Sequence, residues 1–159
     1  MKLLLVQGSH LLEDGRVFKS SRLVYPSLAL PLVAALTPSD VEIQMVNDYY
    51  EEIPFEADFD LVAISVMTVQ SIRAYQIADE FRRRGKRVVM GGFHPTFAPE
   101  ECASHVDAMV IGEAENVWED LIHDAQQHRL KKVYESDRPA DLTHLPVPRY
   151  DLINRNGYS

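Results

Sequence analysis

The stretch that decides the fold is RVVMGGFHPTFAPEECASHVDAMVIGEAENVWEDLI, residues 87–122. It contains two short apolar runs, Arg87–Met90 and Asp107–Ile111, and each is followed by glycine and then by a helix-like segment. In Ala114–Gln127 the apolar side chains recur at helical spacing, and Pro99 with two acids behind it is typical of a helix start. This alternation of strand and helix predicts a parallel sheet covered by helices.

The same alternation continues toward the N-terminus. Three further strand-like runs are Lys2–Gln7, Val41–Val46 and Asp60–Val66, of which the second alternates as a strand near a sheet edge does. Helical patterns occupy Ser27–Leu36 and Val69–Arg84. We therefore expect an α/β fold: a Rossmann-like, flavodoxin-like doubly wound sheet of about five mainly parallel strands, with helices on both faces. We expect an irregular or short helical crossover between the second and third strands.

Composition excludes several classes of protein. The 159 residues suit one domain, and the net charge of −8 disfavours nucleic acid, whose binding depends on cationic contacts to phosphate. No apolar run approaches the roughly 18 residues of a membrane span, and Met1–Gln7 does not resemble a signal peptide. Cys102 is the only cysteine, so a disulfide, a CxxC zinc site and a cysteine-held iron–sulfur cluster are impossible within this chain. We expect a cytoplasmic domain.

Ligands of doubly wound sheets bind at the carboxyl ends of the strands, which directs attention to the turns that follow them. No GxGxxG or GxxxxGK[ST] motif is present, so dinucleotide and Walker-type sites are not predicted. Of the four turns after the first, third, fourth and fifth strand-like runs, three contain glycine, which would let a large ligand approach the backbone. We predict no catalytic residue and no metal ligand, and the candidate cofactor-binding residues are Ser9, His10, Ser65, Thr68, Val69, Gly91, Gly92, Phe93, His94, Gly112, Glu113 and Glu115.

Two long motifs carry a family resemblance. VVMGGFHPTFAPEE (Val88–Glu101) and VDAMVIGEAENVWEDLI (Val106–Ile122) resemble the cobalamin-binding domain that precedes the catalytic domain of many radical S-adenosylmethionine enzymes. That family shows a Gly-Gly-x-His-x-Thr/Ser-x-x-Pro-Glu run followed by a Val-Asp-x-Val-Val-x-Gly-Glu-x-Glu run. YPSLALPLVAAL (Tyr25–Leu36) is similar to its first helix, and DLTHLPVPRYDLI (Asp141–Ile153) to its linker.

The resemblance implies a division of the chain and a cofactor. Residues 1–138 would form the cobalamin-binding domain, and residues 139–159 an extended linker toward a missing radical S-adenosylmethionine domain. That domain would hold S-adenosylmethionine and an iron–sulfur cluster, on a Cys-x-x-x-Cys-x-x-Cys motif that this chain lacks. We expect an N-terminal fragment without turnover of its own, taken from an enzyme of methyl transfer, radical cyclisation or rearrangement.

The resemblance also leaves alternatives open. Cobalamin-dependent mutases carry Asp-x-His-x-x-Gly after the first strand, but alignment on His10 puts Gly8 in place of the aspartate and Glu13 in place of the glycine. Without that carboxylate to orient the imidazole, we expect base-off cobalamin with no histidine on the cobalt. The second hypothesis is a corrinoid-free docking or regulatory domain of the same fold.

Several candidates have simpler structural roles. Ser65 and Thr68 could cap the next helix instead of contacting the phosphate or ribose of the cofactor. Glu113 could stabilise a helix N-terminus instead of receiving a ribose hydroxyl or a corrin amide. His94 could pack beside its neighbours, and the glycine pair at 91 and 92 could simply form a turn.

Overall fold

A computed structural model describes residues 1–20, 22–23 and 25–158; Ser159 at the end of the predicted linker, and Ser21 and Val24 in the loop after the first strand, lie outside the described residues. Within the described part, six strands form one parallel sheet in the order β2-β1-β3-β4-β5-β6. The strands are β1 Lys2–Gln7, β2 Glu42–Asn47, β3 Leu61–Ser65, β4 Arg87–Gly91, β5 Ala108–Ile111 and β6 Val133–Glu135. The flavodoxin-like, doubly wound prediction is confirmed, with β2 at an edge as expected.

The sixth strand was not predicted. It has three residues, of which only Tyr134 is buried, so the sequence carries too little alternation to reveal it. Tyr134 packs with the core beside α5 (Trp118–Gln126), and its hydroxyl donates a hydrogen bond to Oδ2 of Asp124 (2.9 Å). Backbone pairing with β5 therefore extends the sheet, and one buried side chain anchors the strand to the core.

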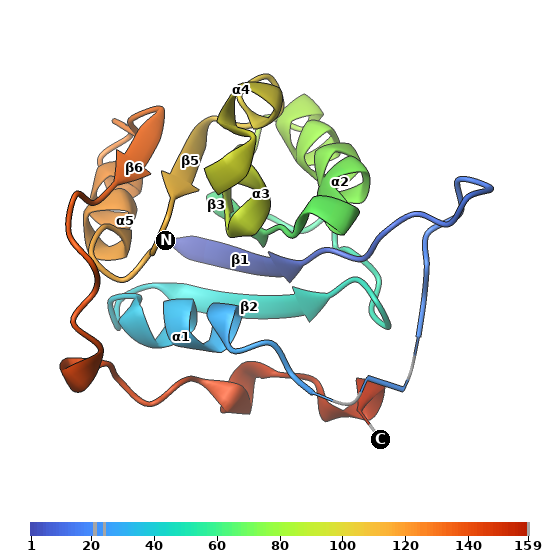
Figure 1. Cartoon of the computed structure of the whole chain (residues 1–159), viewed down its shortest axis with the longest axis horizontal. Coiled ribbons are helices and arrows are strands. Elements are labelled where there is room, and N and C mark those ends of the chain that lie inside the picture. The colour runs from blue at the N-terminus through green and yellow to red at the C-terminus, as the bar shows by residue number, and fades with distance from the viewer. Residues whose placement is uncertain (21, 24, 159) are drawn as a thin grey trace.

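Helices cover both faces of the sheet (Figure 1). α1 and α5 lie on one face, and α2, α3 and α4 lie on the other. Their bounds are α1 Ala29–Leu36, α2 Ser71–Arg83, α3 Phe93–Phe97, α4 Pro99–Cys102 and α5 Trp118–Gln126, with short 3-10 turns η1 Thr68–Gln70, η2 Leu142–His144, η3 Tyr150–Leu152 and η4 Arg155–Gly157. No helix in the described ranges is long and apolar enough to span a membrane.

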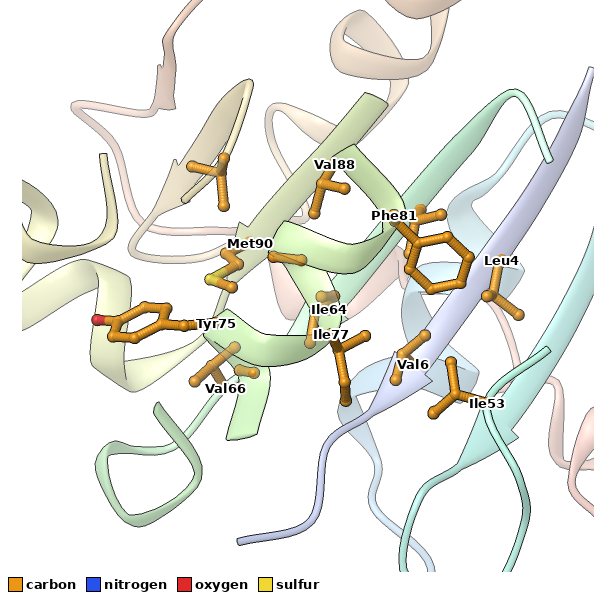
Figure 2. Packing of buried hydrophobic residues seen from close by; sticks show 14 of the residues in the cluster. Leu4, Val6, Ile53, Ile64, Val66, Tyr75, Ile77, Phe81, Val88 and Met90 are labelled. Carbon is orange, nitrogen blue, oxygen red and sulfur yellow. The ribbon is translucent and has the colours of Figure 1, made fainter. Parts of the chain in front are cut away.

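The two apolar clusters follow from the alternation of side chains along each strand. In β1, β3 and β4, even-numbered residues such as Leu4 and Val62 face α2, whereas odd-numbered residues such as Leu3 face α1 and α5. In β5 the numbering is reversed, with Met109 on the α2 side and Val110 on the other. Figure 2 shows Phe81 of α2 among side chains of the sheet. Burial of each such side chain contributes about 1.5–3 kcal/mol, which fixes the register of every central strand.

The C-terminal tail follows the surface of α1 (Figure 1). The backbone N–H of Arg149 donates to the carbonyl oxygen of Pro31 in α1 (2.9 Å), and the hydroxyl of Tyr50 donates to the carbonyl oxygen of Asn154 (2.8 Å). Gly157 lies under the ring of Tyr50, where even a Cβ atom would come within 2.2 Å of the ring. The tail thus joins the region of β5 and β6 to the carboxyl end of β2.

Candidate functional site

A cavity of about 240 Å³ lies between α1 and α5, over the carboxyl halves of β3, β4 and β5. Small residues create it: Ala63, Ser65 and Gly91 point to this face of the sheet, and Ser65 pairs with Gly91 in register. Where β1 carries large leucines on the same face, these strands leave space. The lining residues are Ala29, Leu30, Leu32, Val33, Leu36, Ala63, Ile64, Ser65, Val89, Gly91, Gly92, Val110, Gly112, Glu113, Ala114, Glu115 and Trp118.

Trp118 forms one wall of this cavity and is held by a hydrogen bond. Its Nε1–H donates to Oγ1 of Thr37, just after α1 (2.8 Å), and that hydroxyl donates to the carbonyl oxygen of Val33 (2.8 Å). The single polar atom of the indole is therefore satisfied by α1. Trp118 therefore presents only an apolar surface to the cavity.

At the mouth of the cavity, Thr96 ties two glycine turns together. Its hydroxyl donates to the carbonyl oxygen of Gly92 (2.8 Å) and accepts a hydrogen bond from the backbone N–H of Gly112 (3.0 Å). Both glycines have positive φ, +105° and +74°. Thr96 was not among the predicted site residues, although its place in the Gly-Gly-x-His-x-Thr run was a signal for it.

The structure gives Gly92 a different role from the one expected. A Cβ atom there would lie 2.9 Å from the carbonyl oxygen of Val66, in a backbone conformation that favours glycine. The neighbouring loop alone thus excludes a side chain at this position. At Gly91, by contrast, a Cβ atom would meet only Cβ of Val110 at 3.4 Å, and it would extend into the cavity.

Glu113 and Glu115 lie at the cavity mouth, but neither is in the first turn of a helix. The helix predicted to begin at Ala114 begins at Trp118, because the residues before it form turns, and its N-terminal acids are Glu119 and Asp120. The Glu113 carboxylate instead accepts a hydrogen bond from the backbone N–H of Ala140 in the tail (2.7 Å). The proposed helix-stabilising role of Glu113 is therefore wrong.

His94 is buried on the opposite face of the sheet, away from the cavity. Its Nε2 lies 2.6 Å from the hydroxyl of Tyr75, which also donates to Oε1 of Glu101 (2.9 Å). Burial, with hydrogen bonds to Cys102 and Glu101, raises the pKa of Tyr75 well above its usual value, and burial raises the pKa of the Cys102 thiol. These contacts attach α3 to α2 and give His94 a packing role in the structure.

Ser9 and His10 belong to a third group, at the carboxyl ends of β1 and β2. The backbone N–H of buried Ser9 donates to Asp48, whose fully buried carboxylate also pairs with Arg73 (2.7 Å) and Lys19 (3.2 Å). The ring of His10 stacks on Phe18 with centroids 4.7 Å apart, and its Nδ1 lies 3.4 Å from the hydroxyl of Tyr49. The loop after β1 is thus tied to the β2–β3 crossover.

The remaining candidates form an exposed rim after β3 and β4. Thr68 and Val69 lie in η1 and are exposed, as is Phe93, whose ring stacks on Phe97 with centroids 6.3 Å apart. The helix cap that was the alternative role of Ser65 and Thr68 is formed by neither hydroxyl. The N-cap of η1 is Met67, and the Met67 N–H donates to Oε1 of Gln70 (2.9 Å). In the described part of the chain, no cluster of His, Cys, Asp and Glu side chains could hold a metal ion.

The predicted candidates therefore separate by location. The cavity brings together Ser65, Gly91, Gly92, Gly112, Glu113 and Glu115, and the rim adds Thr68, Val69 and Phe93. Ser9, His10 and His94 lie in hydrogen-bonded or stacked contacts elsewhere. Sequence spacing placed all these residues near the carboxyl edge, but only the structure shows which of them share one space.

Comparison with known proteins finds relatives of similar sequence. The bacteriochlorophyllide d C-8(2)-methyltransferase of Chlorobaculum tepidum is 46% identical over 110 residues, covering 69% of this chain and 24% of the relative. The bacteriochlorophyllide d C-12(1)-methyltransferase of the same organism is 31% identical over 127 residues, covering 79% and 28%. The chain thus spans about a quarter of the length of these relatives.

A solved structure and a family model complete the comparison. The N-terminal domain of a hypothetical protein of Thermotoga maritima aligns with a TM-score of 0.42 and 24% identity, over 54% of this chain and 74% of that one. The family model of the B12 binding domain matches residues 17–122, which include α1, the glycine turns and the cavity. This chain belongs to the B12 binding domain family.

Proposed function

We propose that this chain is the cobalamin-binding module of a radical S-adenosylmethionine methyltransferase, and that it holds the cofactor base-off with no histidine on the cobalt. The observation that carries the proposal is the cavity between α1 and α5, whose floor is the sheet surface at Ala63 and Gly91 and whose mouth begins at Ser65, the last residue of β3. Its volume of about 240 Å³ is below the roughly 300–1,000 Å³ of pockets that enclose whole ligands. It therefore suits one part of a large cofactor.

The residues fit the two chemical parts of cobalamin. The nucleotide tail would enter the cavity, where Gly91 leaves the floor open and Glu113 and Ser65 supply oxygens at the mouth. The corrin macrocycle would lie outside, against the exposed apolar side chains of the rim, among them Val69 and Phe93. When bound, the cofactor supplies a cobalt centre that carries a methyl group, and the chain binds and orients it.

The absence of a protein ligand on the cobalt is supported by the position of His10. Its ring is stacked on Phe18 and its Nδ1 is within reach of the Tyr49 hydroxyl, so the imidazole already has partners. A histidine that binds a metal usually donates its other ring N–H to a carboxylate or a carbonyl oxygen. Asp48, the buried carboxylate nearby, is engaged by Arg73, Lys19 and the loop backbone.

Methyl transfer is supported by the printed names of the two relatives, both of which are methyltransferases. The reaction itself requires parts of the enzyme outside this chain, because the chain corresponds to about a quarter of each relative. The radical domain would follow residues 139–159 and would carry S-adenosylmethionine and the iron–sulfur cluster. The module would then contribute cofactor binding and presentation.

Titration of the purified chain with hydroxocobalamin in equilibrium dialysis tests the proposal. We expect saturable uptake by the unmodified chain, and a loss of affinity in Gly91→Val, which fills the floor of the cavity. Ala103→Val adds the two γ-methyl groups of valine at an exposed position on the other side of the sheet and is the control. A chain that folds but takes up no hydroxocobalamin would instead support a corrinoid-free docking domain.

A further inference from the structure

Polarity is unevenly distributed along the cavity. Polar side chains lie only near the carboxyl ends of the strands, where Ser65, Glu113 and Glu115 surround the mouth. Deeper positions are apolar, and Val89 and Val110 stand two residues before the glycines at 91 and 112 on the same face. α1 adds Leu32, Val33 and Leu36 to this deep part.

The one heteroatom in the deep wall is already paired. Nε1–H of Trp118 donates to Thr37, and the Thr37 hydroxyl in turn donates to the backbone of α1. Among the described residues, no buried side-chain nitrogen or oxygen lacks a hydrogen-bond partner. The backbone groups of β3 and β4 are used in the sheet ladder. The depth of the cavity therefore presents no free side-chain donor or acceptor to a ligand.

A group that enters this depth loses its hydrogen bonds to water and gains none from the walls. Burial of an unpaired polar atom is unfavourable, whereas burial of a methyl group is favourable. Natural cobamides differ in the base of their nucleotide tail. Adenine carries an amino group and several ring nitrogens, whereas dimethylbenzimidazole carries a lone free ring nitrogen and apolar methyl groups.

We infer that the cavity between α1 and α5 selects the lower base of the corrinoid, and that it accepts dimethylbenzimidazole and discriminates against adenine. This inference rests on the proposed function and adds a specificity to it. The discriminating surface is the apolar depth formed by Val89, Leu36 and the ring of Trp118. Ser65 and Glu113 at the mouth are left for the polar ribose and phosphate, which every such cobamide shares.

Equilibrium dialysis of three corrinoids tests the inference: cobalamin, its adenine analogue and cobinamide, which has no nucleotide tail. All three are used as dicyano forms, in which cyanide occupies both axial positions of the cobalt and any base is free. We expect cobalamin to bind at least about tenfold more tightly than the adenine analogue, because leaving one polar group unpaired costs about that factor. Cobalamin should also bind more tightly than cobinamide, which has no base to bury in the apolar depth.

Variants locate the preference. Leu36→Gln brings an amide into the deep part of the cavity and should reduce the preference for cobalamin over the adenine analogue severalfold. Val89→Thr introduces a hydroxyl with almost no change of volume in a strand, and it serves as the second variant if the first does not fold. Leu28→Gln, at an exposed position just before α1 and outside the lining, is the matched control and should leave the preference unchanged.

The possible results are distinct. Equal affinity for cobalamin and the adenine analogue would overturn the inference, as would a full preference that persists in a folded Leu36→Gln. If cobinamide binds as tightly as cobalamin, the base does not occupy the cavity, although the corrinoid-binding function stands. If none of the three binds, the proposed function fails together with the inference.

Discussion

Two neighbouring glycines should respond in opposite ways to alanine. At Gly92 the φ of +105° lies in the left-handed region, which costs a non-glycine residue about 1–2 kcal/mol. The new Cβ would also lie 2.9 Å from the carbonyl oxygen of Val66. That oxygen accepts the N–H of His94 (3.0 Å), and the Val66 N–H donates to Gly91 (2.9 Å), so the loop cannot move freely. Overpacking of this kind adds about 1–3 kcal/mol.

Gly91→Ala should instead be tolerated. Its φ is not in the left-handed region, and the added Cβ would meet only Val110 at 3.4 Å. Alanine also lowers the entropy of the unfolded chain, which stabilises a protein by about 0.4–1 kcal/mol where the conformation allows it. We therefore expect the stability of Gly91→Ala to stay within about 1 kcal/mol of the unmodified chain.

Urea unfolding followed by circular dichroism measures both effects. Gly92→Ala should lose about 2–5 kcal/mol, which at this chain length lowers Tm by about 5–15 °C. The reasoning is refuted if Gly92→Ala unfolds within about 0.5 kcal/mol of the unmodified chain, the range of an ordinary surface substitution. It is also refuted if Gly91→Ala is the more damaging of the two changes.

Further predictions concern other parts of the molecule. Thr37→Val should cost about 1–3 kcal/mol in urea unfolding, because it leaves the indole N–H of Trp118 buried and unpaired; an unchanged midpoint would contradict that hydrogen bond. Hydrogen bonds from the two arginines near the end of α2 lower the pKa of Glu80 to about 2, so its contribution to stability is present above about pH 4.5 and is lost as the pH falls toward 2. Acid unfolding of Glu80→Gln should lack this part of the pH dependence, and identical curves for both chains would count against it. Limited proteolysis should cleave the tail that begins at Pro139 before the body, and early cuts between α2 and α5 would place the domain boundary elsewhere. His10→Ala should leave the absorption spectrum of bound cobalamin unchanged, and a changed spectrum would identify His10 as a ligand.

The sequence predicted the sheet well because each central strand is a compact apolar run, and glycine or polar residues follow each run. It did not predict β6, where Tyr134 alone is buried, or the start of α5, since the apolar spacing continues back to Ala114 through residues that form turns. Local pattern does not distinguish a helix from turns whose side chains face the same core.

The candidate site was predicted less completely. One part of it was accessible to prediction, because the small residues Ala63, Ser65 and Gly91 stand on one face by simple alternation. Two other features were not accessible from the sequence. The hydrogen bond from Trp118 to Thr37 joins residues 81 positions apart, and no local pattern reports it. His94 comes two residues after Gly92, and the positive φ of Gly92 ends the alternation of side chains along β4. The burial of His94 on the α2 side could therefore not be inferred from spacing.

Trp118 is the only tryptophan of the chain, and it forms part of the cavity wall. Intrinsic fluorescence excited near the red edge of protein absorption therefore comes from a single point of the molecule, next to the proposed binding space. Its emission reports the polarity beside that one indole ring and is free of the averaging that several tryptophans would impose. The fold thus contains its own optical probe, and events at this cavity can be followed without attaching a dye.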